Sequence, residues 1–185
     1  REDINGLGIT QIDLSNNVRL NLKKTTFKNG EFLFKVVFGQ GGSSEPYEMP
    51  GLSALAESTV QLSGFQSMDS DQMEDALAGR EVNIEFSIND TYFEVAGSGD
   101  PKEAELIFQL IYTFLKDPGF RPQGLALAKT RYKQMYDALK RTPDGMMRIQ
   151  GDRFLAKGDP KFGLLPPEEI NSITLENVET WLKPV

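Results

Sequence analysis

Alternation of apolar and polar residues predicts three β-strands in the first forty residues. Residues 10–14 and 18–22 each place apolar side chains on one side, and they flank the turn-forming run Ser15-Asn16-Asn17. Asn29-Gly30 is a second turn signal. Phenylalanine or valine then stands at every second position of residues 32–38. This pattern predicts a hairpin followed by a largely buried strand.

The same alternation returns in residues 82–88, and residues 91–96 run back after the turn Asn89-Asp90. Between and after the strands, apolar residues recur at helical spacing. The predicted helices cover residues 51–64, 70–78, 101–116, 123–141 and 143–157, with two short ones that begin at Pro166 and Thr174.

Each long helix has an apolar stripe that we expect to face a sheet or another helix. In helix 51–64 the stripe consists of Leu52, Leu55, Thr59 and Leu62. In helix 101–116 it consists of Ala104, Ile107, Phe108, Ile111, Phe114 and Leu115. In helix 123–141 it consists of Leu125, Ala128, Tyr132, Met135 and Leu139.

The order β-β-β-α-(α)-β-β-α-α-α-α predicts the α+β class, a mostly antiparallel sheet covered by helices. Its two halves suggest a split ferredoxin-like layout, and we expect residues 1–185 to form a single domain.

Composition narrows the classes of partner. Hydrophobic residues make up 39% and charged residues 25%, and the formal net charge is −7. An acidic chain disfavours nucleic acid and anionic lipid as partners. No apolar run approaches the ~20 residues that span a bilayer, so no membrane partner is expected. No signal peptide is visible, although an excised or mature piece would lack one.

The chain contains neither cysteine nor histidine. A disulfide framework is therefore excluded, and so are Ser-His-Asp triads and zinc sites built on imidazole. Any catalysis would rely on carboxylates, lysine, tyrosine, serine or threonine.

Three local motifs favour ordinary structural roles. The Gly-rich loop 39–46 lacks Gly-Lys-Ser/Thr and reads as a turn. The acidic run that begins at Asp69 fails the EF-hand pattern, with Glu74 where glycine is needed and Arg80 at the last position, so we expect a capped helix. The basic face of helix 123–141 could bind anions, but a solvated face is the favoured interpretation.

The order of elements and several short motifs resemble the insulinase or pitrilysin-type (M16) zinc peptidases. Residues 13–20 are similar to the family's "x-L-x-N-G-x-x-L" start, and residues 39–51 to its "G-x-x-x-E-x-x-x-x-G" passage. Residues 83–91 are similar to "N-A-x-T-S-x-x-x-T". Pro118-Gly-Phe120 and residues 164–181 fit the family's second half, although the strand expected after Trp181 is missing.

Active members of that family carry His-x-x-Glu-His on the helix that corresponds to residues 51–64. The two histidines lie one turn apart and bind zinc, and the glutamate acts as general base. Here the motif positions are Ala54, Glu57 and Ser58. The family's third ligand, a glutamate near residues 129–133, is replaced by Lys129, Arg131 and Lys133. The resemblance thus implies a degenerate domain with no catalytic residue, no metal ligand and no cofactor, in which Glu57 is a hydrogen-bonded acid.

In active domains of the family the substrate pairs as an extra strand with an edge that corresponds to Asn83, Ile84, Glu85, Phe86 and Ser87 here. Asn83, Ser87 and Thr91 match the motif. Ile84 and Phe86 are bulkier than the family's alanine and threonine. Two interpretations stay open: this strand is either a peptide-binding edge or a purely structural strand.

The resemblance implies a non-catalytic domain of a longer insulinase-type zinc metalloprotease. It would shape the peptide-binding chamber, while a homologous domain of the same chain or of a partner subunit supplies zinc and proteolysis. The alternative is a non-enzymatic scaffold or peptide-binding subunit, and a third option is a carboxylate-only enzyme that uses Glu57. An upstream His-x-x-Glu-His in the same gene favours the protease. Substrate, oligomeric state and compartment stay open, with the bacterial periplasm as a guess from exported relatives.

Overall fold

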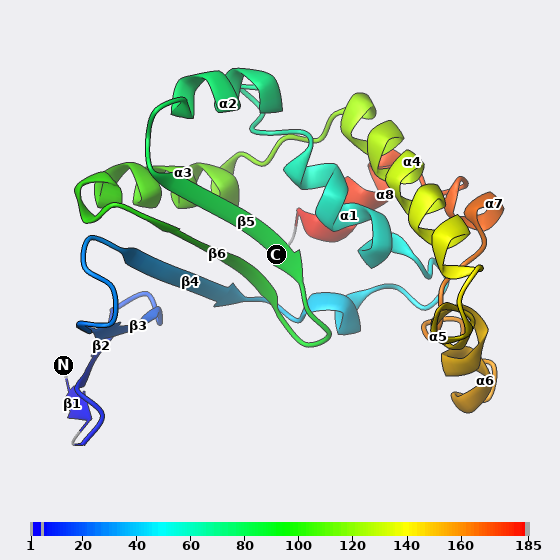
Figure 1. Ribbon diagram of the computed structural model, residues 1–185, viewed down its shortest axis with the longest axis horizontal. Helices are drawn as coiled ribbons and strands as arrows, with labels where there is room; N and C mark the ends of the chain where they lie inside the picture. The colour runs from blue at the N-terminus through cyan, green and yellow to red at the C-terminus, as the bar shows by residue number, and fades with distance from the viewer. Residues whose placement is uncertain (1, 5, 184–185) are drawn as a thin grey trace. The chain divides into compact units, whose positions relative to one another are not determined.

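A computed structural model describes residues 2–4 and 6–183 and assigns the protein to the α+β class, with antiparallel sheets and helices, as predicted. The chain divides into two compact units, Arg1–Glu31 and Phe32–Val185. Figure 1 shows the elements of each unit. The strands belong to two separate three-stranded sheets, β1-β2-β3 and β4-β6-β5, whereas the sequence suggested one.

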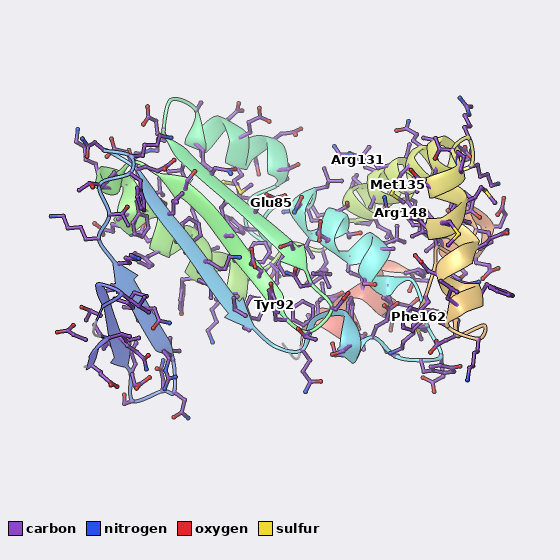
Figure 2. The ribbon with its side chains drawn as sticks, turned by 60° about the horizontal axis from the view of Figure 1, so that its bottom comes forward. Glu85, Tyr92, Arg131, Met135, Arg148 and Phe162 are labelled. Atoms are coloured by element: carbon purple, nitrogen blue, oxygen red, sulfur yellow. The ribbon has the colours of Figure 1, made fainter. Side chains whose placement is uncertain are left out.

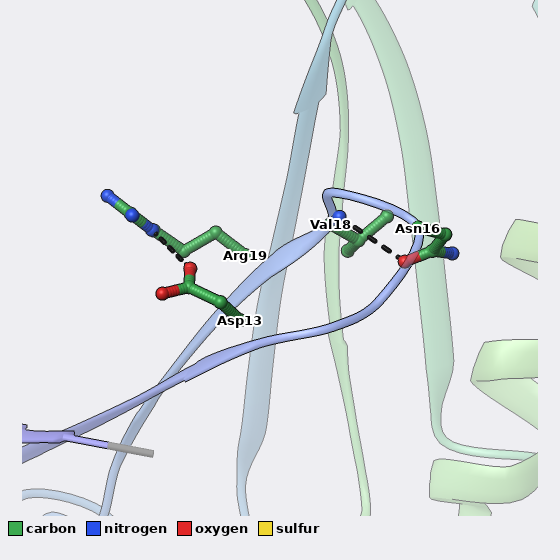
Figure 3. A network of polar contacts seen from close by, with 4 residues as sticks. All are labelled: Asp13, Asn16, Val18 and Arg19. Carbon is green, nitrogen blue, oxygen red and sulfur yellow. Dashed lines mark hydrogen bonds and ion pairs between the residues drawn. The ribbon is translucent and has the colours of Figure 1, made fainter.

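Unit 1 contains β1 (Glu2–Ile4), β2 (Ile9–Asp13) and β3 (Arg19–Lys23), all antiparallel. The predicted hairpin is confirmed as β2 and β3. Figure 3 shows its turn, where Asn16 Oδ1 accepts a hydrogen bond from Val18 N at 3.3 Å and Arg19 Nε donates to Asp13 Oδ1 at 2.7 Å. The Arg19 guanidinium lowers the pKa of the Asp13 carboxyl.

The sheet of unit 2 contains β4 (Phe32–Phe38), β6 (Phe93–Gly99) and β5 (Val82–Ile88), with β6 in the centre. Alternation separates its two faces. Phe34, Gly97 and Ile84 share one row, on the face that packs against helices. Lys35 and Glu85 lie on the opposite face, which is more exposed.

Five helices of eight or more residues are present in the described part of unit 2. They are α1 (Leu52–Gln61), α2 (Ser70–Leu77), α3 (Ala104–Lys116), α4 (Pro122–Leu139) and α8 (Leu175–Leu182). The shorter ones are η1 (Gly41–Ser44), η2 (Pro101–Glu103), α5 (Pro143–Met146), η3 (Met147–Gly151), α6 (Asp152–Leu155) and α7 (Pro167–Ile170). The capped helix expected at the acidic run is confirmed as α2, whose N-cap is Asp69. Thr174 caps α8, and each of these two residues forms part of a capping box.

The core lies between the inner face of the sheet and α1, α3 and α8, and it continues between α1 and α4. Phe93 of the central strand is 1% exposed, and its ring lies 6.2 Å from Phe86 and 5.8 Å from Trp181, centroid to centroid. Burying each such aromatic side chain contributes about 1.5–3 kcal/mol. The sheet and three helices that are distant in sequence therefore share one core.

Two predicted apolar stripes were partly wrong. On α3, Phe108 and Leu115 are 55% and 40% exposed, and Leu110 is buried instead. On α4, Met135 is 39% exposed and Tyr136 is buried. On both helices the buried face therefore differs from the predicted stripe, because contacts with neighbouring segments decide which apolar side chains are covered.

The single helix predicted for residues 143–157 is interrupted. It consists of α5, the π-helical turn η3 and α6. Within η3, the Ile149 carbonyl accepts a hydrogen bond from Leu164 N at 3.1 Å. A contact with a residue fifteen positions away explains why local periodicity missed the break.

Both ends of α1 are held by groups from other segments. At its start, the buried Glu45 carboxylate accepts hydrogen bonds from Leu52 N at 2.7 Å and Ser53 Oγ at 2.8 Å. The Gly-rich loop, read as a plain turn from sequence, forms η1 and brings Glu45 to this position. A carboxylate at a helix N-terminus is favoured by the helix dipole and satisfies an otherwise unpaired N–H.

At the end of α1, the Arg121 guanidinium donates hydrogen bonds to the carbonyls of Ser63, Phe65 and Gln66 at 2.8–3.0 Å. Gly124 lets α4 approach closely, because a Cβ there would lie 2.4 Å from Ser63 Oγ. Hydrogen bonds to a charged group contribute about 1.5–3 kcal/mol. The chain that leaves α1 and the start of α4 are thereby joined.

None of the helices in the described residues is long and apolar enough to cross a membrane.

Tyr132 provides a pH-dependent test of the α4 packing. Burial raises the pKa of its hydroxyl from 10.0 to about 12, and Tyr132 Oη donates to the Leu165 carbonyl at 2.7 Å. Because the folded-state pKa is the higher one, this stabilisation is complete below pH 10 and is lost as pH rises towards 12.

We expect Tyr132→Phe to lower the free energy of unfolding by about 1 kcal/mol at pH 7. The difference between wild type and variant should shrink between pH 10 and pH 12. Urea denaturation at a series of pH values measures both quantities. A difference that stays constant over this range contradicts the buried, hydrogen-bonded phenol.

Candidate metal-site remnant and peptide-binding edge

The three predicted motif positions all lie on α1. Ala54 is exposed, whereas Glu57 and Ser58 are half-buried. Ala54 and Ser58 are four residues apart, so they lie on one face of the helix. Among residues 2–4 and 6–183, no group of three or more His, Cys, Asp or Glu side chains is placed to hold a metal ion.

Helix α4 runs antiparallel beside α1. Gly124, near its start, lies against Thr59 and Ser63, near the end of α1. Further along α4, the Tyr132 hydroxyl donates to the Leu165 carbonyl. The Leu165 side chain lies beside Gly51, which directly precedes the first residue of α1. At about 1.5 Å of rise per residue, the stretch around residues 128–132 is level with Ser58 and Ala54.

The cations predicted for this stretch therefore lie on the segment of α4 beside the motif positions. Lys129 Nζ donates to the Asn171 carbonyl at 2.8 Å, and burial lowers the pKa of its ammonium. Lys133 forms an ion pair with Asp137 at 2.6 Å. Arg131 is exposed, and Figure 2 shows it near Met135 on the same helix. Positive side chains at this place oppose the binding of a metal cation.

Glu57 is engaged with the sheet. Its Oε2 accepts a hydrogen bond from Ile88 N at 2.9 Å. One turn further along α1, Gln61 Nε2 donates to the Phe86 carbonyl. Both partners belong to β5, so α1 extends two polar side chains onto the end of this strand. Sequence reasoning missed Gln61, although its spacing of four residues from Glu57 was a usable signal.

β5 is an edge strand of its sheet, and its main chain has an inward and an outward side. Asp100 N donates to Glu81 O and Asn89 N to Tyr92 O, so odd-numbered residues of this strand pair with β6. The even-numbered residues consequently turn their N–H and C=O groups outward. Glu57 and Gln61 occupy two of those groups, at Ile88 and Phe86.

The outward main-chain groups in the first half of β5 have no such side-chain partners among the described residues. No side chain in the described part of the chain forms a hydrogen bond with the main chain of Val82 or Ile84. A cavity of about 440 Å³ lies beside it. The cavity is lined by residues of α1, the following loop, α2, β5 and α3: Val60, Gln61, Leu62, Gly64, Phe65, Met73, Asn83, Ile84, Glu85, Phe86 and Phe114.

The five predicted edge residues are thus divided between two faces. The side chains of Asn83, Glu85 and Ser87 lie on the open face of the sheet, where Figure 2 labels Glu85. Those of Ile84 and Phe86 lie on the helix-covered face, and Phe86 is only 5% exposed. An open main-chain edge beside a cavity of ordinary ligand size, lined by polar and apolar groups alike, is the kind of surface to which a peptide strand can be added.

Comparison with known proteins identifies a distant curated relative. No family model matches the sequence. The stromal processing peptidase of Arabidopsis thaliana chloroplasts is 25% identical over 183 residues, which cover 93% of this chain and 14% of that protein. The chain therefore spans about a seventh of the length of this relative.

Several solved structures resemble this chain in fold, although their sequences are at most 20% identical to it. The periplasmic protease PqqL from Escherichia coli matches with a TM-score of 0.78 and 20% identity, over 95% of this chain and 19% of that one. The peptidase M16 inactive domain from Pseudomonas fluorescens matches with a TM-score of 0.70 and 16% identity, over 95% of this chain and 43% of that one. The ferredoxin protease FusC, in complex with Arabidopsis ferredoxin, matches with a TM-score of 0.68 and 14% identity, over 96% of this chain and 20% of that one.

The role of Glu57 can be tested by two substitutions. Glu57→Ala removes the acceptor of the Ile88 N–H and should lower the free energy of unfolding by about 0.5–1.5 kcal/mol. Glu57→Gln keeps an acceptor oxygen and should stay within about 0.5 kcal/mol of wild type. Urea denaturation decides the matter, and equal losses in both variants would contradict a hydrogen-bonding role.

Proposed function

The chain has the fold of an M16 peptidase-like domain, and on this premise we propose that it is a non-catalytic domain of an insulinase-type zinc metalloprotease. In this proposal it shapes the chamber that holds the peptide. A homologous domain of the same chain or of a partner subunit supplies zinc and proteolysis. Residues 1–185 are then one domain of a longer chain, in keeping with the greater length of the similar proteins.

The observation that carries the non-catalytic role is the replacement of the metal site. Ala54 has no donor atom and serine is a poor zinc ligand. Beside them α4 carries Lys129 and Arg131, and the Glu57 carboxylate is bonded to Ile88 N. Coordination of zinc needs three protein ligands, and this arrangement offers positive charge in place of the third.

The peptide-holding role is supported by the edge of β5. Main-chain bonds from Val82 and Ile84 would pair with an extended peptide, and the adjacent cavity would accept one apolar side chain. The surrounding segment is acidic, with 15 Asp and Glu against four Lys and Arg between Phe32 and Asp117. We therefore propose that this edge prefers basic, apolar peptides.

A non-enzymatic scaffold or peptide-binding subunit remains the alternative proposal, since it needs the same edge and no metal. The two differ in the rest of the gene. A His-x-x-Glu-His helix in another domain supports the protease, and its absence throughout supports the scaffold.

The metal-free state is tested by equilibrium dialysis of the purified chain against Zn²⁺, followed by elemental analysis. We expect substoichiometric zinc that a brief wash removes. Tight binding of one zinc per chain would sink the proposal.

Strand addition is tested with a fluorescent octapeptide of alternating lysine and valine. Ile84→Pro removes an outward N–H while leaving the bonds between β5 and β6 in place, and proline is tolerated at strand edges. We expect it to weaken peptide binding by about tenfold or more, as for the loss of a hot-spot contact.

Ile84→Val is the matched control, since it keeps the N–H and most of the side chain, and its affinity should be near wild type. Thermal melting of both variants checks the fold. Unchanged binding by a folded Ile84→Pro protein, or no binding by wild type, would rule out strand addition at this edge.

A further inference from the structure

A second surface lies far along the chain from β5, on the segment after α4. We call residues 140–162 the basic arm; it comprises α5, η3, α6 and the loop that follows. Four of its large apolar side chains are at least half exposed: Met147 (52%), Phe154 (82%), Leu155 (70%) and Phe162 (52%). Figure 2 labels Arg148 and, at the end of the arm, Phe162. Exposed apolar groups gathered on one segment are typical of an interaction surface.

The arm borders a concave site. A cavity of about 460 Å³ has Tyr136, Ile149, Leu164 and Pro166 among its lining residues, and these supply apolar surface. Arg153, Phe154, Lys157, Gln150 and Gly158 complete the lining. Its volume is within the range of about 300–1,000 Å³ that is usual for ligand pockets. It suits one large side chain of a partner.

Two hydrogen bonds to main-chain carbonyls fix the wall of the cavity. Leu164 N donates to the Ile149 carbonyl at 3.1 Å, and Arg153 Nε donates to the Phe162 carbonyl at 3.1 Å. Gly163 has φ of +74°, and a Cβ there would lie 2.6 Å from the Ile149 oxygen. Glycine thus permits the loop to lie against η3. A wall fixed in advance reduces the entropy lost on binding.

The positive charge of the basic arm indicates which kind of partner it would bind. The arm contains six Lys and Arg against three Asp and no Glu, in a chain whose net charge is −7. Among the described residues, no hydrogen bond or ion pair engages the Lys157 side chain. Lys140 Nζ lies 4.8 Å above the Tyr136 ring, which adds a further cation near the cavity. Cations around an apolar hollow complement an acidic partner that carries an apolar side chain.

We propose that the basic arm binds an acidic polypeptide segment, which inserts one aromatic or aliphatic side chain into the cavity beside Tyr136. The partner's carboxylates pair with Lys157 and Arg148, and its apolar neighbours pack on Phe154. A membrane fits less well, because the site is concave and the whole chain is acidic. The inference does not depend on the proposed edge at β5 or on any metal.

The probe is a fluorescein-labelled octapeptide with six glutamates, one phenylalanine and one leucine, titrated into the full chain and followed by anisotropy. We expect Phe154→Ser and Lys157→Glu each to weaken binding by about fivefold to thirtyfold, as for interface hot spots. Added salt should weaken binding further, because part of the attraction is between exposed charges.

Matched controls carry the same substitutions elsewhere. Phe27→Ser changes a phenylalanine that is 92% exposed outside the arm, and Lys116→Glu changes an exposed lysine of α3. Both should bind the acidic peptide like wild type. The affinity for the lysine-valine octapeptide should be the same in Phe154→Ser as in wild type. This result would distinguish the site on the arm from the β5 edge.

Other occupants give distinct results. Binding to phosphatidylglycerol vesicles that depends on Phe154, with no peptide binding, would replace the polypeptide by a membrane. Self-association in sedimentation velocity that Phe154→Ser abolishes would make a second copy the occupant. Either result overturns the proposal, as does peptide binding that Phe154→Ser and Phe27→Ser weaken equally.

Discussion

The fold of unit 2 depends on the anchoring of α1 at both ends. The Glu45 carboxylate holds its first N–H, and the Arg121 guanidinium holds the carbonyls that follow its last turn. Between these two anchors the helix packs Leu55 into the core, and Gly124 lets α4 approach its far side. If either anchor failed, the helix could shift along its axis, and the edge of β5 would lose its support.

The support for β5 comes from two polar side chains of α1. In a zinc domain the side chains on this helix would converge on a metal ion. Here Glu57 and Gln61 reach the end of β5 and satisfy its outward main-chain groups at Ile88 and Phe86. They stop short of Val82 and Ile84, where the cavity begins. The same helix therefore covers one half of the edge and leaves the other half available.

Local signals in the sequence predicted most elements but not their grouping. Period-two patterns located β2 to β6, and the caps at Asp69 and Thr174 are set by their immediate neighbours. The separate sheet of β1–β3 and the exposure of Phe108 depend on contacts between distant segments, which periodicity does not encode. The motif positions on α1 came from the family resemblance, which rests on short stretches of sequence, whereas the cavity is lined by five separate segments and depends on contacts that no short stretch encodes.

The central claim is that an extended peptide pairs with the outer edge of β5 in a domain that has no metal. Amide hydrogen exchange followed by NMR, with and without the lysine-valine octapeptide, tests it most directly. The outward N–H of Ile84 should gain protection when the peptide binds, whereas that of Glu85, already paired with β6, should change little. Peptide binding that leaves the Ile84 amide exchanging at its free rate would contradict the claim.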